Sequence, residues 1–98
     1  MGEGGAVLLD VREPYEWQAG HAPNARHIPL GQLARRAGEL PPGRAVVIVC
    51  RSGTRSARAA ALLARDGREA SNLTGGMHAW ACAGLPVVAR GGGMGSVA

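Results

Sequence analysis

The segment from Cys50 to Ser56 holds the residues best suited to chemistry. In its sequence, Cys-Arg-Ser-Gly-Thr-Arg-Ser, a thiol is followed by two cationic and three hydroxyl side chains. A thiol reacts as its thiolate, and at the ordinary pKa near 8.5 only about 3% of it is ionised at pH 7. Backbone N–H and guanidinium groups stabilise such an anion. The segment therefore predicts an activated cysteine nucleophile.

The flanking sequence supports the same interpretation. The apolar run 45–50 predicts a buried parallel strand, and the Ala and Leu spacing of 56–66 predicts a helix. A strand–loop–helix junction directs N–H groups into one concavity and adds the partial positive charge of the helix N-terminus. Gly53 permits the tight turn with positive φ that such a loop needs. The alternative is that Cys50 is simply the last residue of a buried strand, since buried free Cys is common.

The two arginines of the loop predict the charge of its ligand. Arg51 and Arg55 would repel each other in a small loop unless an anion lay between them. Guanidinium groups form forked hydrogen bonds with oxyanions. The residues that we expect to bind a small anionic substrate are Arg51, Ser52, Gly53, Thr54, Arg55 and Ser56.

The rest of the chain alternates short apolar runs with helical patterns. The predicted strands are 6–11, 26–29, 45–50 and 69–73. The predicted helices are 13–19, 30–40, 56–66 and 77–82. This alternation predicts an α/β fold with a parallel sheet and helices on both faces. Ligands bind such sheets at the carboxyl ends of the strands, where Cys50 would lie together with Asp10 and Arg12.

Length and charge limit the organisation and the partners. The chain has 98 residues, which we divide into one domain at 1–88 and a flexible glycine-rich tail at 89–98. All eleven basic residues are Arg, and apart from Arg35 and Arg36 they are spread along the chain. With two Trp, one Tyr and no Phe, few aromatic rings are available to stack on bases. We therefore expect no nucleic acid partner.

The sequence lacks the patterns that are typical of membrane-spanning, secreted and metal-binding proteins. No apolar run is long enough to span a bilayer, and the N-terminus has no basic region followed by an apolar stretch. No CxxC occurs, and the histidines do not lie at metal-ligand spacings with other ligands. We expect a cytoplasmic protein with no membrane partner, no metal and no cofactor.

Four motifs in this order resemble the signatures of the rhodanese family. They are Val7–Glu13, Gly20–Ala25, Cys50–Ser56 and a closing signature made of Gly75–Trp80 and Gly84–Val87. The resemblance runs from the first motif to the end of the predicted domain. It implies a rhodanese-like α/β fold and a single-domain sulfurtransferase whose catalytic cysteine takes up a sulfane sulfur as a persulfide.

Two features depart from the family pattern. Asn24 stands where Gly is commoner, and Asn tolerates similar backbone conformations. Family members usually carry a strand and a helix before the first signature, and we expect these N-terminal edge elements to be shortened or absent. Because an open sheet edge invites pairing, we predict weak self-association.

The resemblance also implies a two-step reaction. The Cys50 thiolate attacks the outer sulfur of a donor such as thiosulfate, sulfite leaves, and cyanide or a thiol then takes the sulfur. Asp10 and Arg12 either support the loop or form an ordinary ion pair or cap at the strand end. His21 is expected to anchor its own loop by hydrogen bonds. Cys82 matches no signature and is expected to be a small core or surface residue, with a resolving thiol as the alternative.

Two rival functions stay open at this point. Phosphatases of the same fold use the longer spacing Cys-x5-Arg, whereas four residues separate Cys50 from Arg55. The other rival is a persulfide relay or partner-binding module that has little activity on free thiosulfate and exchanges sulfur with a protein. The intact loop argues against an inactive module, but it does not separate a relay from an enzyme that uses free donors.

Overall fold

The alternation of strands and helices is present in the computed structural model, which describes residues 5–97. The strands are β1 (Val7–Asp10), β2 (Arg26–His27), β3 (Val46–Val49) and β4 (Ala70–Asn72). The α-helices are α1 (Pro14–Ala19), α2 (Leu33–Arg36), α3 (Thr54–Arg65) and α4 (Gly76–Cys82). Single 3-10 turns, η1 (Leu30–Gln32) and η2 (Ala37–Glu39), flank α2.

The strands form one parallel sheet in the order β2-β1-β3-β4. Asp10 at the end of β1 lies opposite Val49 at the end of β3, and Ile48 lies opposite Asn72 at the end of β4. The carboxyl ends of these strands therefore share one edge of the sheet. The outer strands of the described sheet are β2 and β4, and self-association through an edge stays a prediction.

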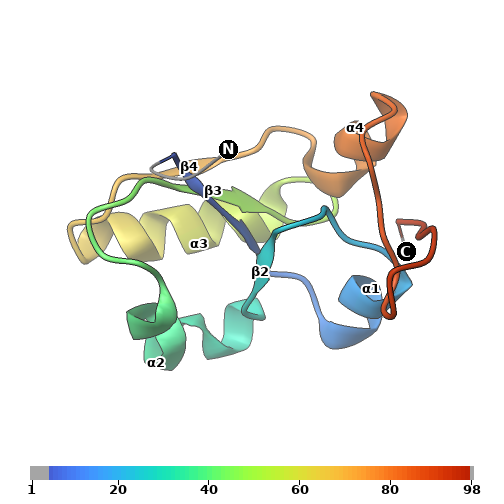
Figure 1. The fold of residues 1–98 in the computed structure, drawn as a ribbon. Coiled ribbons are helices and arrows are strands. Elements are labelled where there is room, and N and C mark those ends of the chain that lie inside the picture. Colours follow the sequence, from blue (N-terminus) through green and yellow to red (C-terminus); the bar gives the residue numbers. More distant parts are fainter. Residues whose placement is uncertain (1–4, 98) are drawn as a thin grey trace.

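The two faces of the sheet are covered by different helices. Leu9 and Ile48 point to one face and pack in a cluster with Leu63 of α3. Leu8 points to the opposite face, because side chains alternate along a strand, and packs in a cluster with Met77 of α4. Figure 1 shows α3 running along the strands and α4 at one end of the sheet. The predicted α/β class, with a parallel sheet between helices, is confirmed.

The prediction of one helix over residues 30–40 is wrong. The segment is divided into η1, α2 and η2. Gly31 and Gly38 lie in the two 3-10 turns, and Gly is about 1 kcal/mol less favourable than Ala in a helix. The apolar spacing still indicates the buried side correctly, since Leu33 and Leu40 are both buried in the core.

The segment 89–97 lies against α1. The N–H of Ser96 donates to the carbonyl of Ala19 at 3.0 Å, and Figure 1 shows the C-terminal end of the chain beside α1. Gly20 permits this approach, since a Cβ there would lie 2.3 Å from the Ser96 carbonyl oxygen. The residues expected to form a flexible tail are therefore in contact with the domain. The domain boundary at residue 88 and the flexibility of the tail stay predictions.

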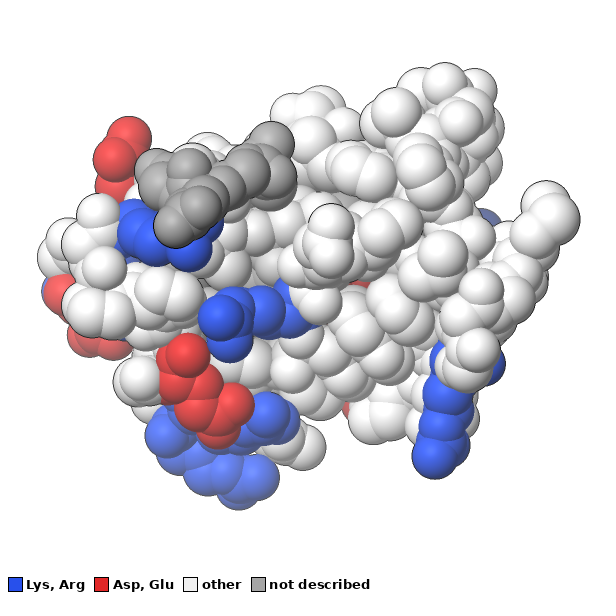
Figure 2. All heavy atoms as spheres, in the orientation of Figure 1, with Lys and Arg blue, Asp and Glu red and all other residues white. Residues whose placement is uncertain are grey.

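Charged side chains are unevenly distributed over the face shown in Figure 2. Basic and acidic groups lie side by side near α2, where Arg36 pairs with Glu39 at 2.8 Å, while the surface over α4 is uncharged. On this face the positive charges form separate patches. Within residues 5–97, no helix has the length and hydrophobicity needed to cross a membrane.

Candidate active site

Cys50 follows β3 directly, and its sulfur is surrounded by hydrogen-bond donors. The residue is 1% exposed. Its Sγ accepts the backbone N–H of Gly53 at 3.0 Å and that of Ser56 at 3.4 Å, and it lies 3.4 Å from Ser56 Oγ. The backbone N–H of Ser52 is a further donor. The structure thus brings four of the predicted site residues together around one atom.

Gly53 gives the loop its sharp turn. It is the N-cap of α3 and has a φ of 110°, a value that residues with a side chain rarely adopt. The helix begins at Thr54, two residues before the predicted start, so Thr54 and Arg55 belong to its first turn. The N–H of the N-cap Gly53 and that of Ser56 in the first turn are therefore directed at the sulfur, together with the partial positive charge of the helix N-terminus. The side chains of Arg51, Ser52 and Thr54 are exposed, whereas Ser56 is buried.

Opposing influences act on the pKa of Cys50. Burial is the largest single influence and raises the pKa, because desolvation disfavours the thiolate. Hydrogen bonds from the side chain and backbone of Ser56 and from the backbones of Gly53 and Ser52 together outweigh it, so the pKa is lowered from its ordinary value. The thiolate fraction at neutral pH rises accordingly, and the thiolate is the nucleophilic form.

Asn72 supports the loop from β4. The Ser56 hydroxyl is hydrogen bonded to the Gly53 carbonyl at 3.1 Å and to Asn72 Oδ1. Asn72 reaches the loop because β4 pairs with β3 and ends beside it. Asn72 is not among the residues predicted from the sequence, where the available signal was a polar residue near the carboxyl end of a predicted strand.

Asp10 and Arg12 form a fully buried ion pair. Arg12 Nη2 donates to Asp10 Oδ2 at 2.9 Å, and both side chains are 0% exposed. The same nitrogen donates to the carbonyl of Gly20 at 2.6 Å. These bonds connect the end of β1 to the end of α1 and do not reach the Cys50 loop directly. The structure contains the predicted ion pair at the strand end, and support of the Cys50 loop by Asp10 and Arg12 stays a prediction.

Arg55 is paired with Glu16 of α1. Its Nη1 and Nη2 donate to Glu16 Oε1 and Oε2 at 2.6 and 2.9 Å. The hydrogen bond with Arg55 lowers the pKa of Glu16 although burial opposes it, and Glu16 in turn raises the pKa of Arg55. The repulsion between Arg51 and Arg55 predicted an anionic ligand between them, but a carboxylate of the chain already faces Arg55. Glu16 escaped notice because it lies 39 positions away.

The start of α4 packs against the other side of the loop. The N–H of Met77 donates to the Cys50 carbonyl at 2.6 Å, and the N–H of His78 donates to the Arg51 carbonyl at 3.0 Å. Gly76 makes this packing possible: its φ is +56°, and a Cβ would lie 2.2 Å from the Cys50 carbonyl oxygen. Close packing against the Cys50 carbonyl therefore explains why the closing motif carries a glycine at position 76.

Two further candidates, His21 and Cys82, lie outside the loop. His21 Nδ1 lies 2.7 Å from the Trp17 carbonyl, and its ring stacks on Trp17 with centroids 3.6 Å apart, which agrees with the expected anchoring role. Cys82 is a free, exposed cysteine on α4. Its Sγ lies 3.9 Å from His78 Nε2.

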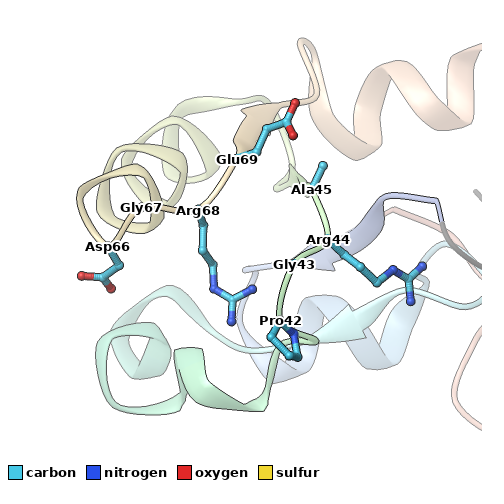
Figure 3. Close-up of a pocket in the computed structure, with 8 residues that line it drawn as sticks. All are labelled: Pro42, Gly43, Arg44, Ala45, Asp66, Gly67, Arg68 and Glu69. Atoms are coloured by element: carbon cyan, nitrogen blue, oxygen red, sulfur yellow. The ribbon is translucent and has the colours of Figure 1, made fainter.

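A cavity of about 440 Å³ lies at the opposite edge of the sheet (Figure 3). Its lining segments, 42–45 and 66–69, precede β3 and β4, whereas Cys50 follows β3. In its wall, Arg68 donates to the carbonyls of Pro41 and Leu40 at 3.0 and 3.1 Å. Because parallel strands begin at one edge and end at the other, this cavity is separate from the Cys50 site.

The parallel sheet and the donor-lined cysteine loop at its edge agree with the family that the motifs indicate. A family model described as a rhodanese-like domain matches residues 1–83. The chain belongs to the rhodanese-like domain family, and the predicted family and fold are confirmed.

Individual relatives fit this assignment. A protein named sulfurtransferase from Allochromatium vinosum is 45% identical over 84 residues, which cover 85% of this chain and 78% of that protein. The putative sulfur carrier protein YrkF of Bacillus subtilis is 40% identical over 74 residues, covering 74% of this chain and 40% of YrkF. The crystal structure of a rhodanese-related protein from Thermoplasma volcanium matches with a TM-score of 0.82 at 33% identity, covering 86% of this chain and 84% of that one.

Proposed function

We propose that this protein is a thiosulfate sulfurtransferase that carries a sulfane sulfur on Cys50 as a persulfide and delivers it to cyanide or a thiol. The observation that supports this most strongly is the set of donors around Cys50 Sγ, at 3.0 Å from the Gly53 N–H and 3.4 Å from the Ser56 N–H. Donors fixed around a sulfur stabilise its anionic forms, and both the thiolate and the persulfide are anions.

The first half-reaction loads the sulfur. The Cys50 thiolate attacks the outer sulfur of thiosulfate, a new S–S bond forms, and the S–S bond of thiosulfate breaks with its electron pair leaving on sulfite. No external oxidant or reductant is needed, because the donor sulfur keeps its oxidation level. The exposed Arg51 and the one-third exposed Arg55 both belong to the loop and can attract the dianionic donor, although Glu16 offsets part of the charge of Arg55.

The second half-reaction unloads the sulfur. Cyanide or a thiolate attacks the outer persulfide sulfur, the persulfide S–S bond breaks, and its electron pair returns to Cys50 as the thiolate. Cyanide becomes thiocyanate, and a thiol acceptor becomes a persulfide. The loop donors stabilise the departing thiolate as they stabilised the nucleophile. Because the sulfur waits on Cys50 as a persulfide after sulfite has left and before the acceptor reacts, the kinetics should be ping-pong.

A protein-to-protein persulfide relay is the second candidate. It is favoured by the relatives, which include a putative sulfur carrier protein of Bacillus subtilis and a probable adenylyltransferase/sulfurtransferase, MoeZ, of Mycobacterium tuberculosis. This chain covers only 40% and 20% of those two proteins, so their partners are not transferred to it. In the relay, Cys50 would carry the same persulfide, but a protein persulfide would replace thiosulfate as the donor.

Intact-mass measurement tests the proposal. After incubation with thiosulfate, the protein should gain the mass of one sulfur atom, and cyanide should remove it with release of thiocyanate. Cys50→Ser should gain nothing, while Cys82→Ser, the matched control, should load normally. Loading from a cysteine-desulfurase persulfide but not from thiosulfate would select the relay. Absence of loading from thiosulfate, 3-mercaptopyruvate and the desulfurase alike would overturn both candidates.

A further inference from the structure

Ser56 has more hydrogen-bond neighbours than it has hydrogens to donate. Its Oγ lies 3.4 Å from Cys50 Sγ and 3.1 Å from the Gly53 carbonyl, and it is hydrogen bonded to Asn72 Oδ1. A hydroxyl donates one hydrogen and accepts two. When that hydrogen points to Asn72 Oδ1 or to the Gly53 carbonyl, Ser56 cannot donate it to the sulfur.

With the Ser56 hydrogen on Asn72 Oδ1, the arrangement suits the protonated form of Cys50, whereas the hydrogen bond by which the Ser56 side chain lowers the pKa of Cys50 requires that hydrogen to point to the sulfur. The thiol S–H can donate to Ser56 Oγ, whose own hydrogen then goes to Asn72 Oδ1, so the hydrogen bonds run from the sulfur toward β4. A thiolate or persulfide anion has no hydrogen to give and only accepts. In the anionic states the chain of hydrogen bonds has to run in the opposite direction, from β4 toward the sulfur.

The side chain at position 72 is of a type that permits this reversal. An asparagine amide carries a carbonyl oxygen and an NH2 group of nearly the same size. A half-turn of the amide places Nδ2 where Oδ1 lies, so that Nδ2–H donates to Ser56 Oγ. The Ser56 hydrogen is then released for Cys50 Sγ. Ser56 is 0% exposed, so the protein groups around it determine where its hydrogen points.

We propose that Asn72 is a positioning residue for sulfur transfer, and that the orientation of its side-chain amide determines whether Ser56 Oγ donates a hydrogen bond to Cys50 Sγ. The relevance to sulfur transfer rests on the proposed function, but the hydrogen-bond chain itself belongs to the free thiol. Because both anionic states of Cys50 accept hydrogen bonds, the turned amide would stabilise them relative to the thiol.

The charged groups near the site stay constant in this proposal. From α3, the charge that acts on Cys50 is that of Arg55, which is paired with Glu16 of α1. Arg51 follows Cys50 in the loop, and its carbonyl is held by α4. The variants described below alter none of these three residues. Asn72→Asp itself adds a carboxylate, whose charge also disfavours the thiolate, so the uncharged Asn72→Ala and its combination with Ser56→Ala decide whether the effect passes through the hydrogen bonds.

The test measures the alkylation of Cys50 by iodoacetamide as a function of pH, in a Cys82→Ser background that leaves one thiol. Asn72→Asp keeps the shape of the side chain, but at neutral pH its carboxylate only accepts hydrogen bonds. The Ser56 hydroxyl hydrogen should then stay on the carboxylate and not reach Cys50 Sγ. The alkylation rate at pH 7 should fall about tenfold, equivalent to about 1.4 kcal/mol, and the midpoint of the rate against pH should move to higher pH. Asn72→Ala should produce a smaller change in the same direction. Ser71→Ala, on an exposed neighbour in β4, is the matched control and should change nothing.

A double variant shows whether Asn72 acts through Ser56. Ser56→Ala removes the hydroxyl, so adding Asn72→Ala to it should leave the pH profile of Cys50 unchanged. An equal shift with and without Ser56, or a wild-type profile for both variants at position 72, would overturn the proposal. The two variants differ in size and charge, so the test survives if one of them does not fold. If the wild type failed to load sulfur, the proposed function would be lost, while the alkylation profiles would still decide the hydrogen-bond chain.

Discussion

Cys50 and Cys82 show that access to a thiol and activation of a thiol are separate properties. Cys82 is exposed on α4, whereas Cys50 is buried at the end of β3. Burial alone would make Cys50 the poorer nucleophile, because it raises the pKa, yet the hydrogen bonds from the Ser56 side chain and from the N–H groups of the loop together reverse that effect. The described polar neighbour of Cys82 is a single imidazole nitrogen at 3.9 Å. Activation therefore follows from donors that a strand–loop–helix junction fixes around the sulfur.

Exchange of each cysteine for serine should give the largest difference between the two sites. We expect Cys50→Ser to lower thiosulfate:cyanide sulfurtransferase activity about a thousandfold or more, because the nucleophile is lost. Cys82→Ser should keep most of the wild-type kcat/KM. Steady-state assays of thiocyanate formation check both, and near-normal turnover by Cys50→Ser would contradict the assignment of the site.

The two cysteines also differ in how tightly their surroundings are packed, which two glycines can test. In Gly76→Ala, the new Cβ would meet the Cys50 carbonyl, 2.2 Å away, at a φ of +56°. Overpacking and left-handed strain together should lower the free energy of unfolding by about 3 kcal/mol or more. In Gly84→Ala, near Cys82, φ is +78° but nothing lies within 4 Å, so the strain alone should cost about 1 kcal/mol. Urea denaturation followed by circular dichroism compares them, and equal losses would show that close packing at Cys50 is unimportant.

The ion pair between Glu16 and Arg55 connects α1 to the helix that activates Cys50, and its effect should be smaller. Glu16→Gln should lower stability at pH 7 by about 1 kcal/mol, a modest value because Arg55 is 33% exposed. Arg55 lowers the pKa of Glu16, so the contribution of the pair is present above the unfolded pKa of Glu, about 4.3, and is lost as pH falls through the folded value. The stabilities of wild type and variant should therefore converge in acid. Glu39→Gln, in the exposed pair with Arg36, is the control and should change less; a pH-independent difference for Glu16→Gln would contradict this account.

The smallest signal is expected for phosphate ester hydrolysis. A phosphoryl group brings several oxygens that each need a donor, and the loop with four residues between Cys50 and Arg55 is shorter than the Cys-x5-Arg loop that holds them. Wild type should hydrolyse p-nitrophenyl phosphate no faster than Cys50→Ser does. Robust turnover that disappears in Cys50→Ser would show that loop length was the wrong discriminator.

Local patterns were sufficient to predict the strands, most of the helices and the Cys50 loop. The run 45–50 predicted β3 because buried parallel strands are continuously apolar, and the residues after it predicted a donor-lined turn. The partners of the loop were not predictable in this way. Glu16 meets Arg55 across 39 positions, and Asn72 reaches Ser56 only through the register of β4 on β3. Such contacts depend on tertiary pairing, which no local spacing encodes.

The order in which the chain is synthesised gives the support from β4 and α4 a further consequence. Asn72 and the Met77 amide follow Cys50 in the sequence, so a nascent chain that ends before them lacks part of the surroundings of the thiol. Parallel strands pair between distant segments and form slowly compared with local structure. Until β4 and α4 have docked, the loop lacks the contacts from Asn72 and Met77, and Cys50 should react more slowly than in the complete domain. The reactivity of Cys50 therefore reports completion of the fold, and in the Cys82→Ser variant, which leaves one thiol, a thiol-reactive dye could follow folding.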